Sequence, residues 1–361
     1  MAIAIVALAC PHWVNAQFSG SGTGTESDPY LIYNQDQLAQ VGNFLDQEGV
    51  VFELKKDLDL STWIAENSPS QGWTPIGVET APFKGVFKGN NHTISGVFIN
   101  RPTIDYVGFF GSISGATVRD VVFKATYITG KNRVGAFVGY AYNNSTINNV
   151  TITVTGNSGV TGASWVGGVA GRIESSTISN SSYTGKLNGT TTDVGGVAGY
   201  ASASTISGCN TQFTLSGVSS VGGVAGNLIG STIQNTIATG NITASSSNVG
   251  GVVAYGTGTS TITGSKHTGD ISGVLYVGGV VGRIYSGSIT LNKSHSKGKI
   301  TNTGNYTGGV VGYSAHAGIN AMTDCSHFGD IVGVNYVGGL VGMINFQCRR
   351  GATLLSTEHE I

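Results

Sequence analysis

Val166-Gly167-Gly168-Val169-Ala170-Gly171 is one of nine copies of a short phrase that decides how this chain folds. The copies begin at Val107, Val134, Val166, Val194, Val221, Val249, Val277, Thr307 and Val337, and successive starts lie 27 to 32 residues apart. A period this regular indicates a solenoid, in which each repeat buries its apolar face only against its neighbours. We call this repeated stretch the VGGVAG phrase.

Each repeat contains three short strand candidates. The first is the VGGVAG phrase, whose alternation places Val and the following Ala or Val on opposite faces, and whose glycine pair permits a tight bend. The second is a Ser-Thr-Ile stretch, and the third carries a Gly-x-aliphatic pattern such as Gly269-Asp270-Ile271. Three strands and their turns fill one turn of a parallel β-helix. We therefore expect an all-β, right-handed parallel β-helix of about nine turns. A β-propeller is the alternative, but its blades need about 40 residues and four strands.

Composition narrows the class of protein. Only 10% of the 361 residues are charged, 57 are Gly, and the net charge is −1. No apolar run reaches the length of a membrane-spanning helix, so we expect no transmembrane segment. The basic residues are scattered, which disfavours a nucleic-acid partner. The cysteines Cys209 and Cys325 lie about four turns apart, too far for a disulfide.

The ends of the chain differ from the repeats. An apolar run and the small residues of Val14-Asn15-Ala16 predict a signal peptide over residues 1–16, with acylation at Cys10 as a weaker alternative. Residues 17–28 are rich in Gly, Ser and Thr and are predicted to be a flexible linker. The repeats occupy 107–343. Residues 344–361 follow no repeat rule, and we expect an irregular, truncated or frame-shifted tail.

Residues 29–106 are predicted to form a capping module that shields the first turn. Asn34 is placed to cap a short helix that carries Leu38, Val41 and Leu45 on one face. Strands are expected at 50–60 and on both sides of a Gly-Asn turn within 83–94. The segment before residue 107 holds 11 of the 19 acidic residues, so its composition is unlike that of the repeats.

The repeats resemble the GLUG-motif family, which is named for this Gly-hydrophobic-Gly phrase. The leader Gly24–Ile32, the stretch Asp57-Leu58-Asp59-Leu60 and the segment Pro82–Gly96 are similar to that family's entry module, so the resemblance covers residues 22–343. It implies an exported bacterial surface protein, of a kind found especially in Bacteroidetes, in adhesin-like proteins and beside IgA-cleaving metallopeptidase domains. It carries no catalytic residue onto this chain.

The residues that could perform chemistry do not converge. β-Helices host polysaccharide hydrolases and lyases, but these need paired carboxylates or an acidic Ca²⁺ site. The repeats contain only Asp120, Glu174, Asp193, Asp270, Asp324 and Asp330. Asp270 and Asp330 share a repeat position two turns apart, which is about 10 Å and too far for one metal ion.

Histidine and threonine columns were tested in the same way. His267 and His327 lie four residues before their anchoring Ile, and His295 lies five before, so it should face the other way. No metal or other cofactor is therefore predicted. The threonines at 146, 177, 205, 232 and 261 form one column without a uniform second column. A hydroxyl ladder between turns is favoured over an ice-binding face.

We therefore predict a non-enzymatic, secreted or cell-surface protein that serves as a β-helix scaffold or adhesin segment, as part of a longer multidomain chain. Glycans or host and cell-surface proteins are the expected partners. Trp63, Trp73, Phe83 and Trp165 are the candidate ligand contacts, with packing in the cap and core as the alternative role. The alternatives are a carbohydrate-active β-helix enzyme and the non-catalytic arm of a larger surface metalloprotease.

Overall fold

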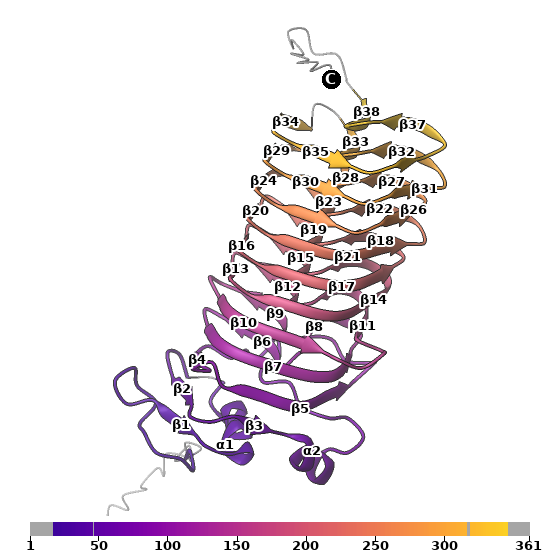
Figure 1. The fold of residues 1–361 in the computed structure, drawn as a ribbon. Helices are drawn as coiled ribbons and strands as arrows, with labels where there is room; N and C mark the ends of the chain where they lie inside the picture. The colour runs from indigo at the N-terminus through magenta and orange to yellow at the C-terminus, as the bar shows by residue number, and fades with distance from the viewer. Residues whose placement is uncertain (1–16, 46, 316–317, 346–361) are drawn as a thin grey trace, which may run out of the picture.

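The computed structural model describes residues 17–45, 47–315 and 318–345 and confirms the predicted parallel β-helix of about nine turns. The turns stack from the N-terminal module to the C-terminal end (Figure 1). All pairings between named strands are parallel, because each strand bonds to its counterpart in the turns before and after it. The predicted signal peptide and residues 346–361 of the predicted tail lie outside the described residues.

One wall of the coil is a nine-stranded sheet with one strand from each turn. In order along the stack its strands are β6 (Phe110–Ser114), β9 (Val138–Tyr142), β12 (Ala170–Glu174), β15 (Ala198–Ser202), β19 (Ala225–Ile229), β23 (Val253–Thr257), β28 (Val281–Ile284), β33 (Val311–Ala315) and β38 (Val341–Asn345). The last of these strands extends two residues into the region predicted as an irregular tail.

The remaining strands form one hydrogen-bonded system that wraps the rest of the coil in three columns. The first column contains β7 (Thr117–Thr129), β10 (Thr146–Val154), β13 (Thr177–Ser179), β16 (Thr205–Ser207), β20 (Thr232–Gln234), β24 (Thr259–Thr263), β29 (Ser288–Asn292) and β34 (Ile319–Thr323). The second contains β14 (Ser182–Gly195), β17 (Asn210–Gly217), β21 (Ile237–Ala244), β25 (Lys266–Thr268), β26 (Ile271–Gly273), β30 (His295–Lys297), β31 (Ile300–Asn302), β35 (Ser326–Phe328) and β36 (Ile331–Val332). The third contains β8 (Asn132–Gly135), β11 (Val160–Gly167), β18 (Ser219–Gly222), β22 (Ser247–Gly250), β27 (Leu275–Gly278), β32 (Asn305–Gly308) and β37 (Asn335–Gly338). Long strands such as β7, β10 and β14 continue from one column into the next.

The VGGVAG phrase is a corner between two sheets, so its prediction as a single strand was wrong. Val166-Gly167 ends β11, Gly168 and Val169 form a bend, and Ala170 begins β12 in the nine-stranded wall. Because of this bend, Val166, Val169 and Ala170 are all fully buried, and the predicted alternation between opposite faces does not hold. The Gly pair permits the bend because a Cβ on Gly167 would lie 1.9 Å from the Ala170 carbonyl oxygen.

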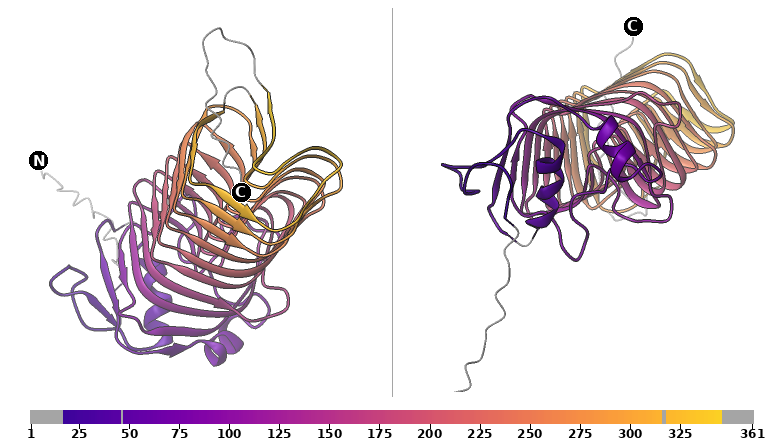
Figure 2. Two further views of the ribbon diagram at one scale, coloured as in Figure 1. Left: turned by 45° about the horizontal axis from the view of Figure 1, so that its top comes forward. Right: turned by 90° about the horizontal axis from the view of Figure 1, so that it is seen from below.

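The N-terminal module closes the first turn of the coil. It contains β1 (Tyr30–Ile32), β2 (Val51–Leu54), β3 (Leu58–Asp59), β4 (Val86–Lys88) and β5 (Thr93–Asn100), together with α1 (Gln35–Gln40), a 3-10 turn (Val41–Asn43) and α2 (Ser61–Asn67). Seen from below, the two helices lie across the end of the stack (Figure 2). Asn34 caps α1 as predicted, since its Oδ1 accepts the Gln37 amide at 2.9 Å. The second helix, α2, was not predicted.

An aromatic core joins the module to the repeats. Phe52 contacts Phe83 at 6.3 Å between ring centroids, Phe83 contacts Phe110 at 5.3 Å, and Phe110 contacts Phe137 at 5.7 Å. All four rings are fully buried. The apolar interior therefore runs without interruption from the module into the second turn.

Residues 17–28 differ from the predicted flexible linker. Phe18 is only 5% exposed and packs against Tyr30, Phe44 and Phe52. The amides of Thr23 and Gly24 both donate to the Asp28 carbonyl, and the Gly24 carbonyl accepts the Val51 amide. The Gly, Ser and Thr residues that suggested a linker form tight turns here, and the buried Phe18 anchors the segment to the module.

Candidate functional site

A column of side chains lies at the corner just before each VGGVAG phrase. Its members, which share the position preceding the first residue of the phrase, are Tyr106, Arg133, Trp165, Asp193, Ser220, Asn248, Tyr276, Tyr306 and Tyr336. All nine have φ between 53° and 68°, in the left-handed region. We call them the corner column.

Left-handed backbone favours glycine, because a Cβ costs about 1–2 kcal/mol there. Two other corners of the coil consist mainly of Gly, Asn and Asp, the residues that tolerate this backbone best. One repeats through Asn91, Asp120, Asn149, Asn180, Gly208, Asn235, Gly264, Lys293 and Asp324, and the other through Gly115, Asn144, Ser175, Ala203, Gly230, Gly258 and Gly287. The corner column contains no Gly in nine turns and has Tyr, Trp or Arg in six of them. Its side chains therefore have a role that the backbone alone does not explain.

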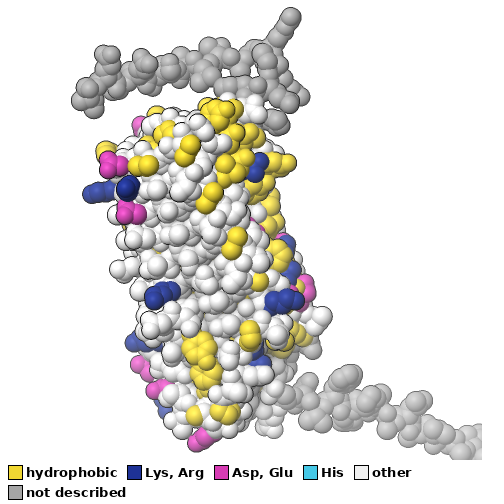
Figure 3. Space-filling model, turned by 90° about the vertical axis from the view of Figure 1, so that its right-hand side faces the viewer, with side chains coloured by type: hydrophobic (Ala, Val, Ile, Leu, Met, Phe, Trp, Pro, Cys, Tyr) yellow, Lys and Arg dark blue, Asp and Glu magenta, His cyan; other side chains and the backbone are white. Residues whose placement is uncertain are grey.

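A second column lies beside the first, on the nine-stranded wall. Its members, paired in register, are Ser112, Tyr140, Arg172, Tyr200, Asn227, Tyr255, Arg283, Tyr313 and Met343. Together the two columns form the aromatic strip, which runs the length of the stack. In Figure 3, hydrophobic side chains gather toward the C-terminal end of the molecule, and charged side chains form a few small groups on a largely uncharged surface.

The N-terminal part of the strip is a stack of alternating arginines and rings, which we call the lower cluster. The Arg133 guanidinium lies 4.6 Å from the ring centroids of both Tyr106 and Trp165. Arg172 lies 5.2 Å from Trp165 and 4.8 Å from Tyr200. Such contacts hold an arginine over an aromatic face by cation–π attraction. The arrangement fixes both guanidinium planes against the surface.

Carboxylates neutralise both arginines of the lower cluster. Arg172 forms an ion pair with Glu174, which also accepts a 2.5 Å hydrogen bond from the Tyr140 hydroxyl. Arg133 pairs with Asp105 at 3.4 Å. Burial, together with the bond to Glu174, raises the pKa of Tyr140. The two arginines and two carboxylates of the lower cluster therefore have no net charge.

The C-terminal part of the strip, the upper cluster, consists of tyrosines around one arginine. The rings of Tyr276, Tyr306 and Tyr336 stack in successive turns with centroids 5.1 and 4.9 Å apart and interplanar angles of 12° and 9°. Tyr313 packs at 5.1 Å against both Tyr276 and Tyr306. The Arg283 guanidinium lies 4.5 Å from the Tyr276 centroid and 5.7 Å from that of Tyr313.

Polar residues separate the two clusters. Asp193, Ser220 and Asn248 occupy the corner column in three successive turns, and all three are buried. Burial raises the pKa of Asp193 to about 6, although hydrogen bonds from Thr192 and other neighbours act in the opposite direction. In these turns the corner column is therefore filled by small polar side chains, while the second column has the half-buried Tyr200, Asn227 and Tyr255.

Only one of the four predicted ligand contacts belongs to the strip. Trp165 is half-buried in the lower cluster. Phe83 and Trp73 are 0% and 2% exposed and belong to the core, as the packing alternative stated. Trp63 is half-buried on α2, where its Nε1 donates to Asp36 at 2.7 Å, and with Trp73 it borders a hollow of about 320 Å³. The structure does not bring the four residues together.

The tyrosines and arginines of the strip were missed by the sequence analysis. A signal for them was present, since Tyr directly precedes the phrase at Tyr106, Tyr276, Tyr306 and Tyr336. The flanking positions vary in residue type, and only their backbone conformation shows that they form one column.

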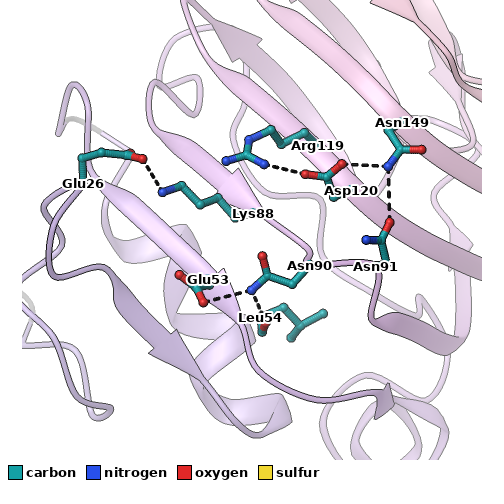
Figure 4. Close-up of polar contacts among 9 residues, drawn as sticks. All are labelled: Glu26, Glu53, Leu54, Lys88, Asn90, Asn91, Arg119, Asp120 and Asn149. Atoms are coloured by element: carbon teal, nitrogen blue, oxygen red, sulfur yellow. Dashed lines mark hydrogen bonds and ion pairs between the residues drawn. The ribbon is translucent and has the colours of Figure 1, made fainter.

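The acidic side chains outside the strip form hydrogen bonds and ion pairs at different places and are not gathered into one site. Asp120 pairs with Arg119 and accepts the Asn149 amide, while Glu26 pairs with Lys88 and Glu53 accepts from Asn90 (Figure 4). Asp270 accepts the backbone amide of Lys299 at 2.8 Å. Within residues 17–45, 47–315 and 318–345, no three His, Cys, Asp or Glu side chains are grouped as metal ligands. These contacts are those of turn and surface residues.

The register settles the histidine, threonine and cysteine columns. His267 aligns with Ser296 and His327, whereas His295 aligns with Lys266 and Ser326, so the predicted offset is confirmed. Thr146, Thr177, Thr205, Thr232 and Thr261 align in one column, and the position two residues on is mixed. Cys209 and Cys325 are both free.

No helix among the described residues is long and apolar enough to span a membrane.

Comparison with known proteins gives partial matches. No family model matches the chain. A protein of Evansella cellulosilytica, provisionally named a Gly-rich membrane protein, is 38% identical over 141 residues, and halomucin of Haloquadratum walsbyi is 35% identical over 159 residues. These matches cover 38% and 43% of this chain but only 16% and 2% of those relatives. The chain therefore spans a small part of each relative's length.

Two solved structures are similar at low identity. A chain from Bacteroides ovatus, provisionally named an immunoglobulin A1 protease, is 19% identical with a TM-score of 0.49, and the match covers 88% of this chain and 86% of that one. A chain named IgA1 protease is 19% identical with a TM-score of 0.46, over 77% of this chain and 21% of that one.

Proposed function

We propose that this chain is a non-enzymatic surface protein, a β-helix scaffold or adhesin segment of the GLUG type, that recognises a partner through the aromatic strip. The observation that carries the proposal is the corner column. Nine turns keep a side chain where the backbone favours Gly, and six of them have a half-buried or exposed Tyr, Trp or Arg there. Tyr, Trp and Arg are the residues that dominate binding energy in protein interfaces.

The shape of the strip supports recognition over catalysis. Its rings and guanidinium groups are held by stacking, and the two carboxylates that form ion pairs with its arginines are already engaged: Asp105 by Arg133, and Glu174 by Arg172 and Tyr140. A glycosidase needs a second carboxylate at a defined distance across a substrate. A surface location is supported by the name of the Evansella relative, which refers to a membrane protein.

The test is a binding screen of the protein against immobilised glycans and cell-surface proteins. A double variant, Tyr306→Ser with Tyr313→Ser, should abolish the binding that the wild type shows. Tyr33→Ser is the matched control, because Tyr33 is 44% exposed and lies in the module, outside the strip. Binding that survives the double variant, or release of new sugar ends from polysaccharides by the wild type, would contradict the proposal.

A further inference from the structure

Within the part of the chain that the structure describes, Arg283 is the one arginine of the strip that forms no ion pair with a carboxylate. No side-chain ion pair or hydrogen bond joins it to another described residue, whereas Arg133 and Arg172 each pair with a carboxylate. Four tyrosine rings surround its guanidinium, at 4.5 Å for Tyr276, 4.9 Å for Tyr285, 5.7 Å for Tyr313 and 6.0 Å for Tyr255. A positive charge is therefore held among four aromatic rings, and no described carboxylate neutralises it.

Arg172 provides an internal comparison. It occupies the same column as Arg283, four turns earlier, and is also flanked by rings. Glu174 lies two residues after Arg172 and neutralises its charge in an ion pair, whereas Tyr285 lies two residues after Arg283. The same backbone position can thus supply a carboxylate from within the chain, and in the upper cluster it does not.

We infer that Arg283 and its tyrosines bind a carboxylate of a partner, in the place that Glu174 fills beside Arg172. This inference rests on the proposed function, because it names what the strip recognises. An Arg guanidinium donates two parallel N–H···O bonds to a carboxylate, and the surrounding rings strengthen the pair by excluding water. The tyrosine hydroxyls supply further donors at the rim.

The stacking favours an acidic protein segment over an acidic sugar as the occupant. Tyr306 has both ring faces covered, by Tyr276 on one side and Tyr336 on the other. A pyranose that packs on an aromatic face finds no free face there, whereas hydroxyl edges and a guanidinium suit Glu and Asp side chains. Charge is complementary too, since the described repeats, residues 107–345, hold 11 basic and 6 acidic residues, a net +5.

The experiment measures binding of a dye-labelled decapeptide of alternating Glu and Gly by fluorescence anisotropy at low salt. A Gln–Gly decapeptide and a tetragalacturonate are the comparison ligands. We expect the Glu peptide to bind the wild-type protein and Arg283→Gln to weaken that binding at least tenfold. Arg283→Lys keeps the charge but loses the planar fork, and should recover only part of the affinity.

Lys297→Gln is the matched control, because it removes the same charge from an exposed side chain on β30, in another column of the coil. It should change the affinity less than twofold. Circular dichroism and thermal unfolding of each variant show whether it is folded. Equal binding of the Glu peptide by wild type and a folded Arg283→Gln variant would overturn the inference.

Two other outcomes also test the choice of partner and the Arg283 site. Arg283-dependent binding of tetragalacturonate without binding of the Glu peptide would overturn the choice of a protein partner. Absence of binding by either acidic ligand, while Tyr306→Ser with Tyr313→Ser still abolishes partner binding in the screen, would overturn the Arg283 site and leave the proposed function standing. The proposed function fails separately if partner binding persists in the variant with Tyr306→Ser and Tyr313→Ser.

Discussion

At the scale of single residues, left-handed corners separate structural from functional positions. Ala203 has φ 47°, and its side chain is exposed, so no burial of the methyl group offsets the strain of the left-handed backbone. Ala203→Gly should therefore raise the free energy of unfolding by about 0.5–1 kcal/mol. Guanidinium unfolding measures it. Ala321→Gly, in the extended strand β34, is the control and should lower stability by a similar amount; the same sign for both would contradict the argument.

Two buried titratable residues should give opposite pH dependences. Burial raises the pKa of Asp193 from 3.8 to about 6, so its stabilising contribution is complete below pH 3.8 and is lost as pH rises through 6. Burial lowers the pKa of His267 from 6.5 to about 4, so its contribution is complete above pH 6.5 and is lost as pH falls through 4. Each change corresponds to about 3 kcal/mol.

Unfolding of the single variants at pH 4 and pH 6.5 separates the two groups. Relative to wild type, Asp193→Asn should lose about 3 kcal/mol on acidification, because the opposing effect of His267 remains. His267→Ala should gain about as much relative to wild type over the same range. Parallel pH curves for either variant and wild type would show that the buried group does not titrate in this window.

At the scale of the element, the glycines of the phrase are required by the turn above them. A Cβ on Gly279 would lie 2.0 Å from the carbonyl oxygen of Gly309 in the next turn. Gly339 occupies the same phrase position in the last described turn, and a Cβ there meets nothing within 4 Å. Gly279→Ala should cost more than about 2 kcal/mol, and Gly339→Ala less than about 0.5 kcal/mol. Comparable losses in chemical unfolding would contradict the stacking explanation.

The sequence predicted the repeat unit, the parallel stack and the cap on α1, because these follow from local spacing and capping chemistry. It could not show that the phrase turns a corner, since alternation and a bend at Gly168 and Val169 give similar patterns. The aromatic strip was missed for a related reason. Its members are unlike in chemistry, and their common feature is a positive φ, which no residue type specifies except glycine.

At the scale of the whole molecule, the N-terminal module is the part that keeps the open end of the coil from associating. A chain that begins at residue 107 would expose Phe109 and Phe110, which are now fully buried against the module. We expect that chain to form oligomers or aggregates, and a chain that begins at residue 17 to stay monomeric. Light scattering after size exclusion measures this, and a monomer in both cases would refute the capping role.

The parallel register has a mechanical consequence. Hydrogen bonds between successive turns point along the long axis, so tension applied to the two ends peels turns off one by one. Each turn of 27 to 32 residues would release roughly 100 Å of chain, at about 3.5 Å per residue, while the remaining turns stay folded. Held at both ends, the molecule would act as a stepwise shock absorber that lengthens under load before its partner is torn away.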